Sequence, residues 1–418
     1  MTFASNVLPL LLVLVVIPGL ARELDPATFG FFMVGWSSLG FTSLLDFGLG
    51  RAIAHYAARA SGGDPVTATP LCQAAFALLA ALGIALCIVL LGAHSIARFF
   101  FAQWADTASA VRWLIMCVPF AVLTAGARGA LEGAARFNAA AAARVISALL
   151  LICVPALVAH TRPTLPAIGV GFLAARVLAM AVTVAIEHRY SGLLSWSFSR
   201  HGYDMASFRT VVSYSGWVGT SNLLGSLLAY VDRIALSLSS LVQVALYSPP
   251  FELASRVLMV PGAIVTVLFT AFSRASRSTD EVRLILRRGY LSCLVGMAPP
   301  LIVLSAFAAE ILGLWLGQSY QPEQQVIARY VCLGVFLNGM GHVPVAALQG
   351  LGQPRMATLV HMVELLPTGL LFYWMVSANG AVGAAQAWTI RSAADLALMH
   401  LAYVRVLRRK VPSMEPGS

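Results

Sequence analysis

Charged side chains are scarce in this chain: Asp, Glu, Lys and Arg together make up 11% of its 418 residues. A soluble domain usually carries about 25% charged residues and about 45–50% apolar ones. Here 59% of the residues are hydrophobic, and the mean hydropathy is +0.83. This composition excludes an ordinary soluble domain and indicates a chain whose side chains mostly face lipid or other helices.

The motifs of metal, redox and glycosyl-transfer sites are also missing. The sequence contains no Asp-x-Asp, no His-Glu-x-x-His and no Cys-x-x-Cys, and its six cysteines lie singly in apolar runs. Isolated cysteines of this kind are typical of buried structural thiols. The longest hydrophilic segment, residues 187–210, is too short for a catalytic domain. We therefore expect neither an enzyme nor a bound metal or cofactor.

Apolar runs long enough to cross a bilayer recur along the whole chain. A hydrocarbon core of about 30 Å needs about 20 apolar residues in a helix. We predict an all-α, polytopic membrane protein with twelve transmembrane helices. The expected spans are 3–20, 29–48, 70–92, 111–127, 139–159, 166–186, 211–231, 243–270, 289–308, 329–348, 357–377 and 381–402.

These spans divide the chain into two halves of six. We predict an N-terminal six-helix lobe at 1–186, a cytoplasmic interfacial linker at 187–210, a C-terminal six-helix lobe at 211–402 and a basic tail at 403–418. The first apolar run has no basic segment before it and no small-residue cleavage site after it, so we expect a retained span and not a signal peptide.

The distribution of basic residues predicts the orientation. The chain has 26 Arg and a single Lys, and its net charge is +10. With both termini in the cytoplasm, 18 basic residues fall on the cytoplasmic side, six on the opposite side and three within spans. Positive charge concentrates on the cytoplasmic side of membrane proteins. We expect a multi-pass protein of the bacterial inner membrane that contacts membrane lipids and no nucleic acid.

Several short motifs occur in order along the chain. LDFGLGR (45–51) resembles the Asp-x-Gly-x-Gly signature of polysaccharide and O-antigen flippases. DRIAL (232–236) with VALYS (244–248), LFTAFSR (268–274) and LQGLGQ (348–353) are similar to span junctions of the same family, although a Pro is more usual than Thr270. The chain therefore resembles the polysaccharide-transport branch of the multidrug/oligosaccharidyl-lipid/polysaccharide exporter superfamily.

The resemblance implies a MATE-like fold, with two six-helix lobes around a central cavity. It also implies alternating access and a polyprenyl diphosphate, specifically undecaprenyl diphosphate, that carries an oligosaccharide as cargo. A polysaccharide polymerase and a chain-length regulator are partners that this class of function brings with it. A coupling ion, if one is used, would be H⁺ or Na⁺.

Arginines within spans are candidates for binding such an anionic cargo. A charge at the bilayer centre costs roughly 2.5–3.5 kcal/mol on insertion scales, and guanidinium groups fork onto phosphate or carboxylate oxygens. Arg176, Arg256 and Arg391 lie within spans, and Arg233 lies at the end of one. Arg176 either lines a wet cavity or belongs to an interhelical ion pair, whereas Arg256 and Arg391 either face a cavity or pair with a carboxylate four residues away in the same helix; the sequence leaves these alternatives open.

Acidic and neighbouring residues are candidates for gating or ion coupling. Glu252 precedes Arg256 by four residues and Arg391 precedes Asp395 by four, so either pair can be structural. His361 and Glu364 are three apart and either shuttle a proton or pack together. The remaining candidates are Asp46 and Arg51 in the glycine motif and Asp232 beside Arg233, whose adjacent side chains should project about 100° apart.

A lipid-linked oligosaccharide flippase is the leading hypothesis for function. A multidrug exporter of the same superfamily is the alternative, but organic cations call for cavity carboxylates in the first half, where Asp46 at a helix end is the single candidate. A membrane enzyme of polysaccharide assembly is a weaker alternative because its motifs are missing. Two Gly-x-x-x-Gly patterns, Gly129 with Gly133 and Gly313 with Gly317, predict close helix packing.

Overall fold

The computed structural model describes the chain apart from residues 1, 43–45, 47, 64, 101–104, 195–223, 225–227, 229, 275–278 and 411–418. The described residues form helices and no strand. They divide into two compact units, Met1–Ser226 and Leu227–Ser418. Most of the predicted linker, the first part of the seventh span and the end of the tail lie outside the described residues.

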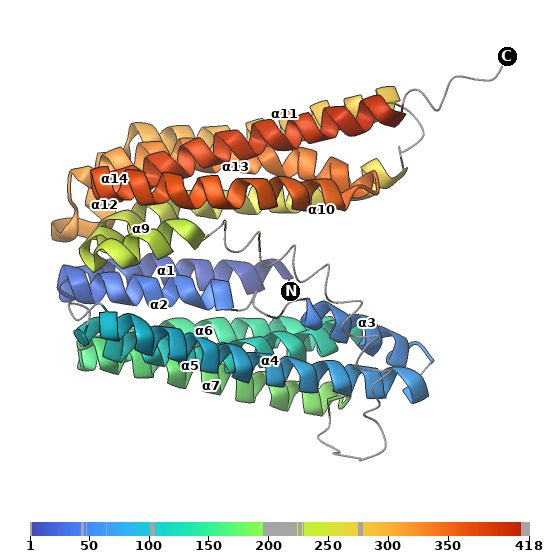
Figure 1. The fold of residues 1–418 in the computed structure, drawn as a ribbon, viewed down its shortest axis with the longest axis horizontal. Coiled ribbons are helices and arrows are strands. Elements are labelled where there is room, and N and C mark those ends of the chain that lie inside the picture. Colours follow the sequence, from blue (N-terminus) through green and yellow to red (C-terminus); the bar gives the residue numbers. More distant parts are fainter. Residues whose placement is uncertain are drawn as a thin grey trace. The chain divides into compact units, whose positions relative to one another are not determined.

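The described part of the first unit contains seven helices, labelled as in Figure 1: α1 (Thr2–Glu23), α2 (Pro26–Thr42), α3 (Leu49–Ser61), α4 (Pro65–Phe100), α5 (Ala105–Gly133), α6 (Phe137–Thr161) and α7 (Leu165–Tyr190). Helix α5 packs against α3, α4 and α7, and α7 also packs along α6. A bundle of apolar helices is the expected outcome for this composition, because in lipid every backbone polar group must be satisfied within the helix.

The break between α1 and α2 follows from local chemistry at Asp25. The Oδ1 atom of Asp25 accepts hydrogen bonds from the backbone N–H groups of Ala27 and Thr28 at 3.0 and 3.1 Å. Together with Pro26, which has no N–H to satisfy, this caps α2. A hydrogen bond from the Thr28 side chain, supported by these backbone amides, holds the pKa of Asp25 below its ordinary value.

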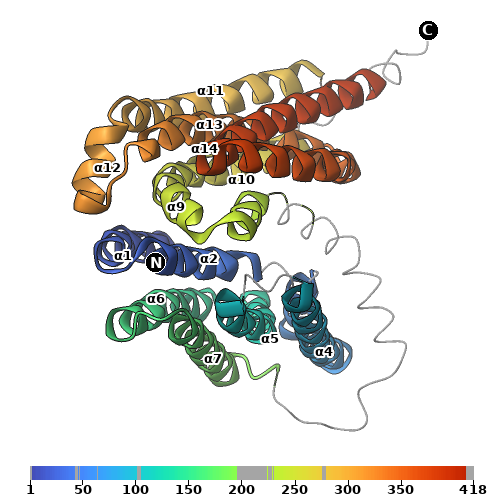
Figure 2. The same cartoon turned by 60° about the vertical axis from the view of Figure 1, so that its left-hand side comes forward.

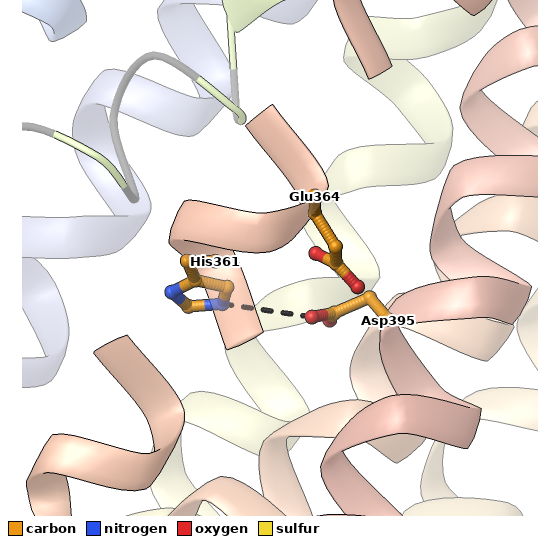
Figure 3. Close-up of side chains that lie close together, drawn as sticks. All are labelled: His361, Glu364 and Asp395. Atoms are coloured by element: carbon orange, nitrogen blue, oxygen red, sulfur yellow. Dashed lines mark ion pairs between the residues drawn. The ribbon is translucent and has the colours of Figure 1, made fainter. Parts of the chain in front are cut away.

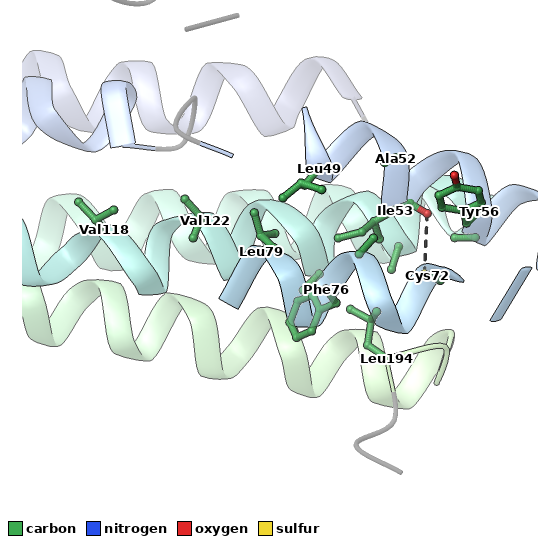
Figure 4. Packing of buried hydrophobic residues seen from close by; sticks show 14 residues of the cluster. Leu49, Ala52, Ile53, Tyr56, Cys72, Phe76, Leu79, Val118, Val122 and Leu194 are labelled. Carbon is green, nitrogen blue, oxygen red and sulfur yellow. Dashed lines mark hydrogen bonds between the residues drawn. The ribbon is translucent and has the colours of Figure 1, made fainter. Parts of the chain in front are cut away.

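Helix α3 is an element that the hydropathy did not predict. It is too polar to cross a membrane but is amphipathic, and the apolar residues on one face recur at helical spacing: Leu49, Ala52, Ile53, Tyr56, Ala57 and Ala60. Apart from Ala60, these side chains pack with Phe76 and Leu79 of α4 and Val118 and Val122 of α5 in one buried cluster (Figure 4). Helix α3 therefore extends the core of the first unit.

The second unit contains α9 (Leu241–Ser255), a 3-10 turn (Arg256–Leu258), α10 (Met259–Arg274), α11 (Thr279–Ala306), α12 (Ala308–Leu316), α13 (Glu323–Gly350) and α14 (Pro354–Lys410). Residues 230–239 form a further helical segment. Helix α13 lies at the centre of this unit, because it packs against α9, α10, α11, α12 and α14. Figure 2 shows these helices from a second direction.

Helix α14 is two arms joined by a sharp turn. Asn379 and Gly380 leave helical geometry, and Gly380 has a positive φ of 54°. The side chain of Gln243, in α9, accepts a hydrogen bond from the Ala381 N–H at 2.6 Å and so caps the second arm. A Cβ on Gly380 would come within 2.5 Å of Gln243 Oε1. Only glycine fits this turn, which separates the last two predicted spans.

The structure is consistent with twelve spans. Eight helices among the described residues are long and apolar enough to cross a membrane, and the longest of them, Arg355–Arg408, holds both of the last two predicted spans. Helices α1 and α2 occupy the first two predicted spans. The chain is a multi-pass membrane protein.

The two glycine patterns have different outcomes. A Cβ on Gly129 would come within 2.4 Å of the Gly50 carbonyl oxygen, and one on Gly133 within 2.1 Å of the Ala54 oxygen. Close packing of α5 on α3 is therefore confirmed. The prediction was wrong for Gly313 and Gly317. Gly317 ends α12 with a positive φ of 62°, and within the described part of the chain a Cβ on Gly313 would meet, outside its own helix, only the Tyr320 ring at 4.0 Å.

Candidate functional site

The described residues of the glycine motif, Asp46 and Gly48–Gly50, form a capped turn into α3. Asp46 accepts hydrogen bonds from the backbone N–H of Gly48 at 3.0 Å and of Gly50 at 3.1 Å. Gly48 has a φ of 77°, which favours glycine. Gly50 lies against both the Asp46 carboxylate and α5. The tight turn expected from the motif is confirmed, and the gating role of Asp46 stays a prediction.

Two other candidates belong to the first unit. The side chain of Arg51 lies outside the described residues. Arg176, in α7, is only 4% exposed, and its charge acts on Cys117 of α5. It is therefore packed within the helices of the first unit. Whether it also meets a cargo is untested, so its binding role stays a prediction.

The candidates in the second unit form two buried groups. In the first, which we call the arginine–carboxylate cluster, Asp232, Arg233, Glu252 and Arg256 meet. Asp232 is fully buried, and its Oδ2 accepts a hydrogen bond from the Tyr247 hydroxyl at 2.7 Å. Arg233 Nη1 lies 3.4 Å from the same oxygen. The expected separation of these adjacent side chains was wrong, because the long Arg233 side chain folds back onto its neighbour.

Glu252 joins the two arginines of this cluster. Its Oε1 lies 3.6 Å from Arg233 Nη2, and its Oε2 pairs with Arg256 Nη2. The predicted Glu252–Arg256 pair is therefore present. Two arginines and two carboxylates make the cluster formally neutral, which lowers the cost of burying it in an apolar helix bundle. Arg256 is the most exposed member, with its side chain 32% accessible.

The helix that carries Glu252 and Arg256 is interrupted there. Pro249 and Pro250 lie inside α9, where neither can donate a backbone hydrogen bond. The carbonyl that Pro250 leaves without its helical donor, that of Leu246, accepts a hydrogen bond from the Gln324 side chain at 3.3 Å. The chain then passes through the 3-10 turn at Arg256–Leu258 before α10 begins. Interruptions of this kind often mark hinges.

Aromatic rings connect the arginine–carboxylate cluster to the last helix. The Arg233 guanidinium lies over the Phe251 ring, 4.1 Å from its centroid. Phe251 meets Trp388 edge to face at 5.3 Å, and the Arg391 guanidinium lies 5.2 Å from the Trp388 ring centroid. Cation–π contacts of this kind stabilise partly desolvated arginines. A continuous Arg–aromatic–aromatic–Arg path therefore crosses the interior of the second unit.

The second group, the acid–histidine cluster, lies across the two arms of α14 (Figure 3). His361 and Glu364 come from the first arm and Asp395 from the second. His361 Nε2 lies 3.5 Å from Asp395 Oδ1, and ligand atoms of all three residues lie within 4.8 Å of one another. The spacing predicted Arg391 as the partner of Asp395. Instead, among the described residues, Asp395 pairs with His361.

Glu364 is the least satisfied member of this cluster. It is 5% exposed, and neither carboxylate oxygen has a hydrogen-bond partner within the described part of the chain. The charge of Arg391 acts on both Glu364 and Asp395. With neutral His361, one arginine and two carboxylates leave the cluster one positive charge short of neutrality. A proton or a small cation would balance it, and one imidazole and two carboxylates can ligate such an ion.

Four residues of these sites were not predicted from the sequence: Tyr247, Phe251, Trp388 and Gln243. Tyr247 lies in the VALYS motif, so the sequence marked the position but did not indicate which residue it contacts. The other three are ordinary apolar or amide residues within spans, and only their neighbours in space reveal what they contact. Composition and spacing carried no signal for them.

The fold defines the class of protein. Of the solved structures it resembles, an inward-facing multidrug resistance MATE family transporter of the MOP superfamily has a TM-score of 0.73 at 17% identity, with 99% of this chain and 98% of that chain covered. The lipid II flippase MurJ, in an inward closed conformation, has a TM-score of 0.73 at 12% identity, with 100% and 93% covered. The architecture is therefore MATE-like, as expected.

The sequence comparison narrows the class to a family. The chain belongs to the polysaccharide biosynthesis protein family, whose model matches residues 1–276. A relative from Shigella flexneri, described as a "Putative O-antigen transporter", is 26% identical over 403 residues, which cover 94% of each chain. The family that the motifs suggested is confirmed.

Proposed function

We propose that this protein flips an undecaprenyl-diphosphate-linked oligosaccharide across the bacterial inner membrane by alternating access. The observation that carries the proposal is the match to the O-antigen transporter relative over 94% of both chains, together with the family match. The fold, which is shared with a lipid II flippase, supports it. The protein would then act in surface polysaccharide assembly, and a polymerase and a chain-length regulator would be its downstream partners.

Arginine is the residue type that suits this cargo. The diphosphate is anionic, and a guanidinium forms paired charge-assisted hydrogen bonds to its oxygens. Among the candidates, Arg256 is best placed to exchange partners, because it is half-buried beside an interrupted helix and Glu252 is its carboxylate partner among the described residues. In this proposal the diphosphate competes with Glu252 for Arg256. When the Arg256–Glu252 ion pair breaks, Arg233 still neutralises the charge of Glu252.

The acid–histidine cluster is the proposed coupling site. Glu364, Asp395 and His361 bind one H⁺ or Na⁺, which restores neutrality beside Arg391. Because the cluster spans the turn at Asn379–Gly380, a change in its charge alters the force between the two arms of α14. This couples ion binding to a change in helix packing without any further cofactor.

Arginine substitutions test the cargo-binding role. In a flippase-null strain that depends on this protein for surface polysaccharide, Arg256→Lys should lower output partially, since charge is kept and the fork is lost. Arg256→Ala should lower it severely, by about tenfold or more if one charge-assisted contact worth about 1.5–3 kcal/mol is lost. Arg176→Ala is tested beside it. Arg355→Ala, an exposed arginine at the start of α14, is the matched control.

Membrane levels of each variant separate binding from folding. Full polysaccharide output from Arg176→Ala and Arg256→Ala combined would rule out a cargo role for both arginines. If the variants instead disappeared from the membrane, the arginines would be structural ion-pair residues, since breaking a buried pair strands its partner. Resistance to organic cations conferred by the wild-type protein, without polysaccharide output, would favour the multidrug exporter alternative.

Substitution of Glu364 tests the coupling site. Glu364→Gln keeps the shape and removes the titratable group, so polysaccharide output should fall while membrane levels hold, and transport should lose its dependence on the driving ion gradient. Glu310→Gln, on an exposed position of α12, changes the same chemistry outside the cluster and should have no effect. Gradient-dependent transport that survives in Glu364→Gln would remove this cluster from the coupling mechanism.

A further inference from the structure

A basic pocket lies between α11 and the second arm of α14, away from the two clusters described above. It encloses about 450 Å³. Arg283 and Arg287 from α11 and Arg408 from α14 stand around it, and Tyr290, His400 and Tyr403 lie deeper. The two helices run antiparallel here, so the beginning of α11 meets the end of α14 (Figure 2). Few backbone atoms approach each other, and side chains define the space.

The charge of this pocket is strongly positive. Arg283 has an exposed partner, Asp280, at 3.5 Å. Within the described part of the chain, neither Arg287 nor Arg408 has a carboxylate at ion-pair distance, and both are exposed at the rim. The rim therefore presents the guanidinium groups of Arg287 and Arg408. The third, that of Arg283, is held by a surface ion pair, and such pairs contribute little stability in water.

The floor of the pocket is polar and incompletely satisfied. The Tyr290 hydroxyl and His400 Nδ1 are hydrogen bonded at 3.1 Å. Tyr403 is only 3% exposed, yet its hydroxyl has no hydrogen-bond partner in the part of the chain that the structure describes. Buried hydroxyls are normally hydrogen bonded, and one that is not calls for an explanation. Tyr403 lines the pocket, but its hydroxyl is shielded from solvent, so a ligand oxygen would supply the missing acceptor after the neighbouring side chains move aside.

Apolar surface leads away from the pocket along both helices. Leu294 lies one turn beyond Tyr290 on α11, and Ala397 lies one turn before His400 on α14; both are exposed. Neighbouring exposed side chains, among them Leu291, Leu398 and Leu401, widen this strip. In a membrane-spanning helix pair, exposed apolar residues face acyl chains. The arginines at the end of this strip therefore lie at the level of the lipid headgroups.

We propose that this pocket binds the headgroup phosphate of an anionic phospholipid. Arg287 and Arg408 hold the phosphodiester oxygens, the Tyr403 hydroxyl donates to one of them, and the acyl chains lie along the Leu294–Ala397 strip. Basic pockets between transmembrane helices recognise anionic headgroups in this way. The location of the arginines at one end of both helices matches the side that the positive-inside rule assigns to the cytoplasm.

The test compares two charge-matched double variants of the purified full-length protein. Arg287→Gln with Arg408→Gln removes both rim arginines. Arg288→Gln with Arg405→Gln removes exposed arginines next to them on the same two helices, outside the pocket lining. Binding of phosphatidylglycerol, phosphatidylcholine, inorganic phosphate and a polyprenyl phosphate is measured for each by native mass spectrometry and by lipid-dependent shifts in melting temperature.

Wild type should retain phosphatidylglycerol in preference to phosphatidylcholine. The pocket variant should bind phosphatidylglycerol about 30-fold more weakly, because each of the two arginines contributes roughly fivefold at a charged membrane surface. The control variant should bind as wild type does. Tyr403→Phe should weaken phosphatidylglycerol binding by a smaller factor, with the lipid-free melting temperature unchanged because its hydroxyl has no hydrogen-bond partner among the described residues.

If the pocket and control variants lost phosphatidylglycerol binding equally, the lipid would be held by diffuse attraction to the basic surface, and the proposal would be overturned. Equal affinity for phosphatidylcholine would also overturn it, as would binding of polyprenyl phosphate or inorganic phosphate in preference to phosphatidylglycerol. The readout is lipid binding by purified protein, so its failure is distinguishable from failure of the proposed flippase activity, which is scored by polysaccharide output in cells.

Discussion

Tyr247 illustrates how single residues hold charge in the interior of this protein. Its hydroxyl donates to Asp232 while Arg233 lies against the same carboxylate, and all three side chains are buried. A buried carboxylate is tolerated only when both charge and hydrogen-bonding capacity are met. Tyr247 supplies the second requirement, and Asp232 depends on it although the two residues lie fifteen positions apart.

We expect Tyr247→Phe to lower the free energy of unfolding of the purified protein by about 1.5–3 kcal/mol, the usual value of a hydrogen bond to a charged group. The ring is retained, so packing changes little. Tyr373→Phe, at a position 76% exposed in α14, is the control and should have no effect. Thermal unfolding in detergent measures both. Equal stabilities would show that Asp232 is satisfied without Tyr247.

At the scale of elements, the close approach of α3 and α5 explains why glycine recurs at this contact. Gly129 and Gly133 of α5 face the backbone of α3 at Gly50 and Ala54. Backbone atoms cannot move aside as a flexible side chain can. The contact in turn fixes the Asp46 turn, because Gly50 lies between the Asp46 carboxylate and α5.

Gly129→Ala should therefore destabilise the protein by about 1–3 kcal/mol, the usual cost of overpacking, even though alanine favours helix. Gly92→Ala in α4 places its methyl group where, among the described residues, no atom outside the adjoining backbone of α4 lies within 4 Å. It should leave stability unchanged or raise it, since alanine is favoured over glycine in a helix by up to about 1 kcal/mol. If both variants melted at the same temperature, α3 and α5 would not pack as closely as described.

At the scale of the whole molecule, the orientation in the membrane is the property that most needs a direct test. The excess of basic residues predicts cytoplasmic reporter signals from fusions after Ala60 and at the C-terminal tail, and a periplasmic signal from a fusion after Gln321. Alkaline phosphatase and fluorescent protein fusions distinguish the two sides. A periplasmic C-terminus would contradict an even number of spans with both ends in the cytoplasm, and would also move the basic pocket to the other leaflet.

The sequence alone was sufficient for the class of fold and for locally encoded features. Apolar runs predicted most of the spans because a bilayer requires each spanning helix to be long, apolar and internally hydrogen bonded. The Asp46 turn was predictable for a similar reason: its donors and acceptor lie within five residues. The ordered motifs were enough to identify the family, which the comparison confirmed.

Contacts between distant residues were decided only by the tertiary structure. Spacing along one helix paired Asp395 with Arg391, whereas the turn at Gly380 brings His361 to Asp395 from 34 positions away and leaves Arg391 against Trp388. Helical spacing likewise could not distinguish Gly129, which meets a neighbouring helix, from Gly317, which ends one. Helix periodicity specifies which residues share a face, but the partner of that face depends on how the chain folds back on itself.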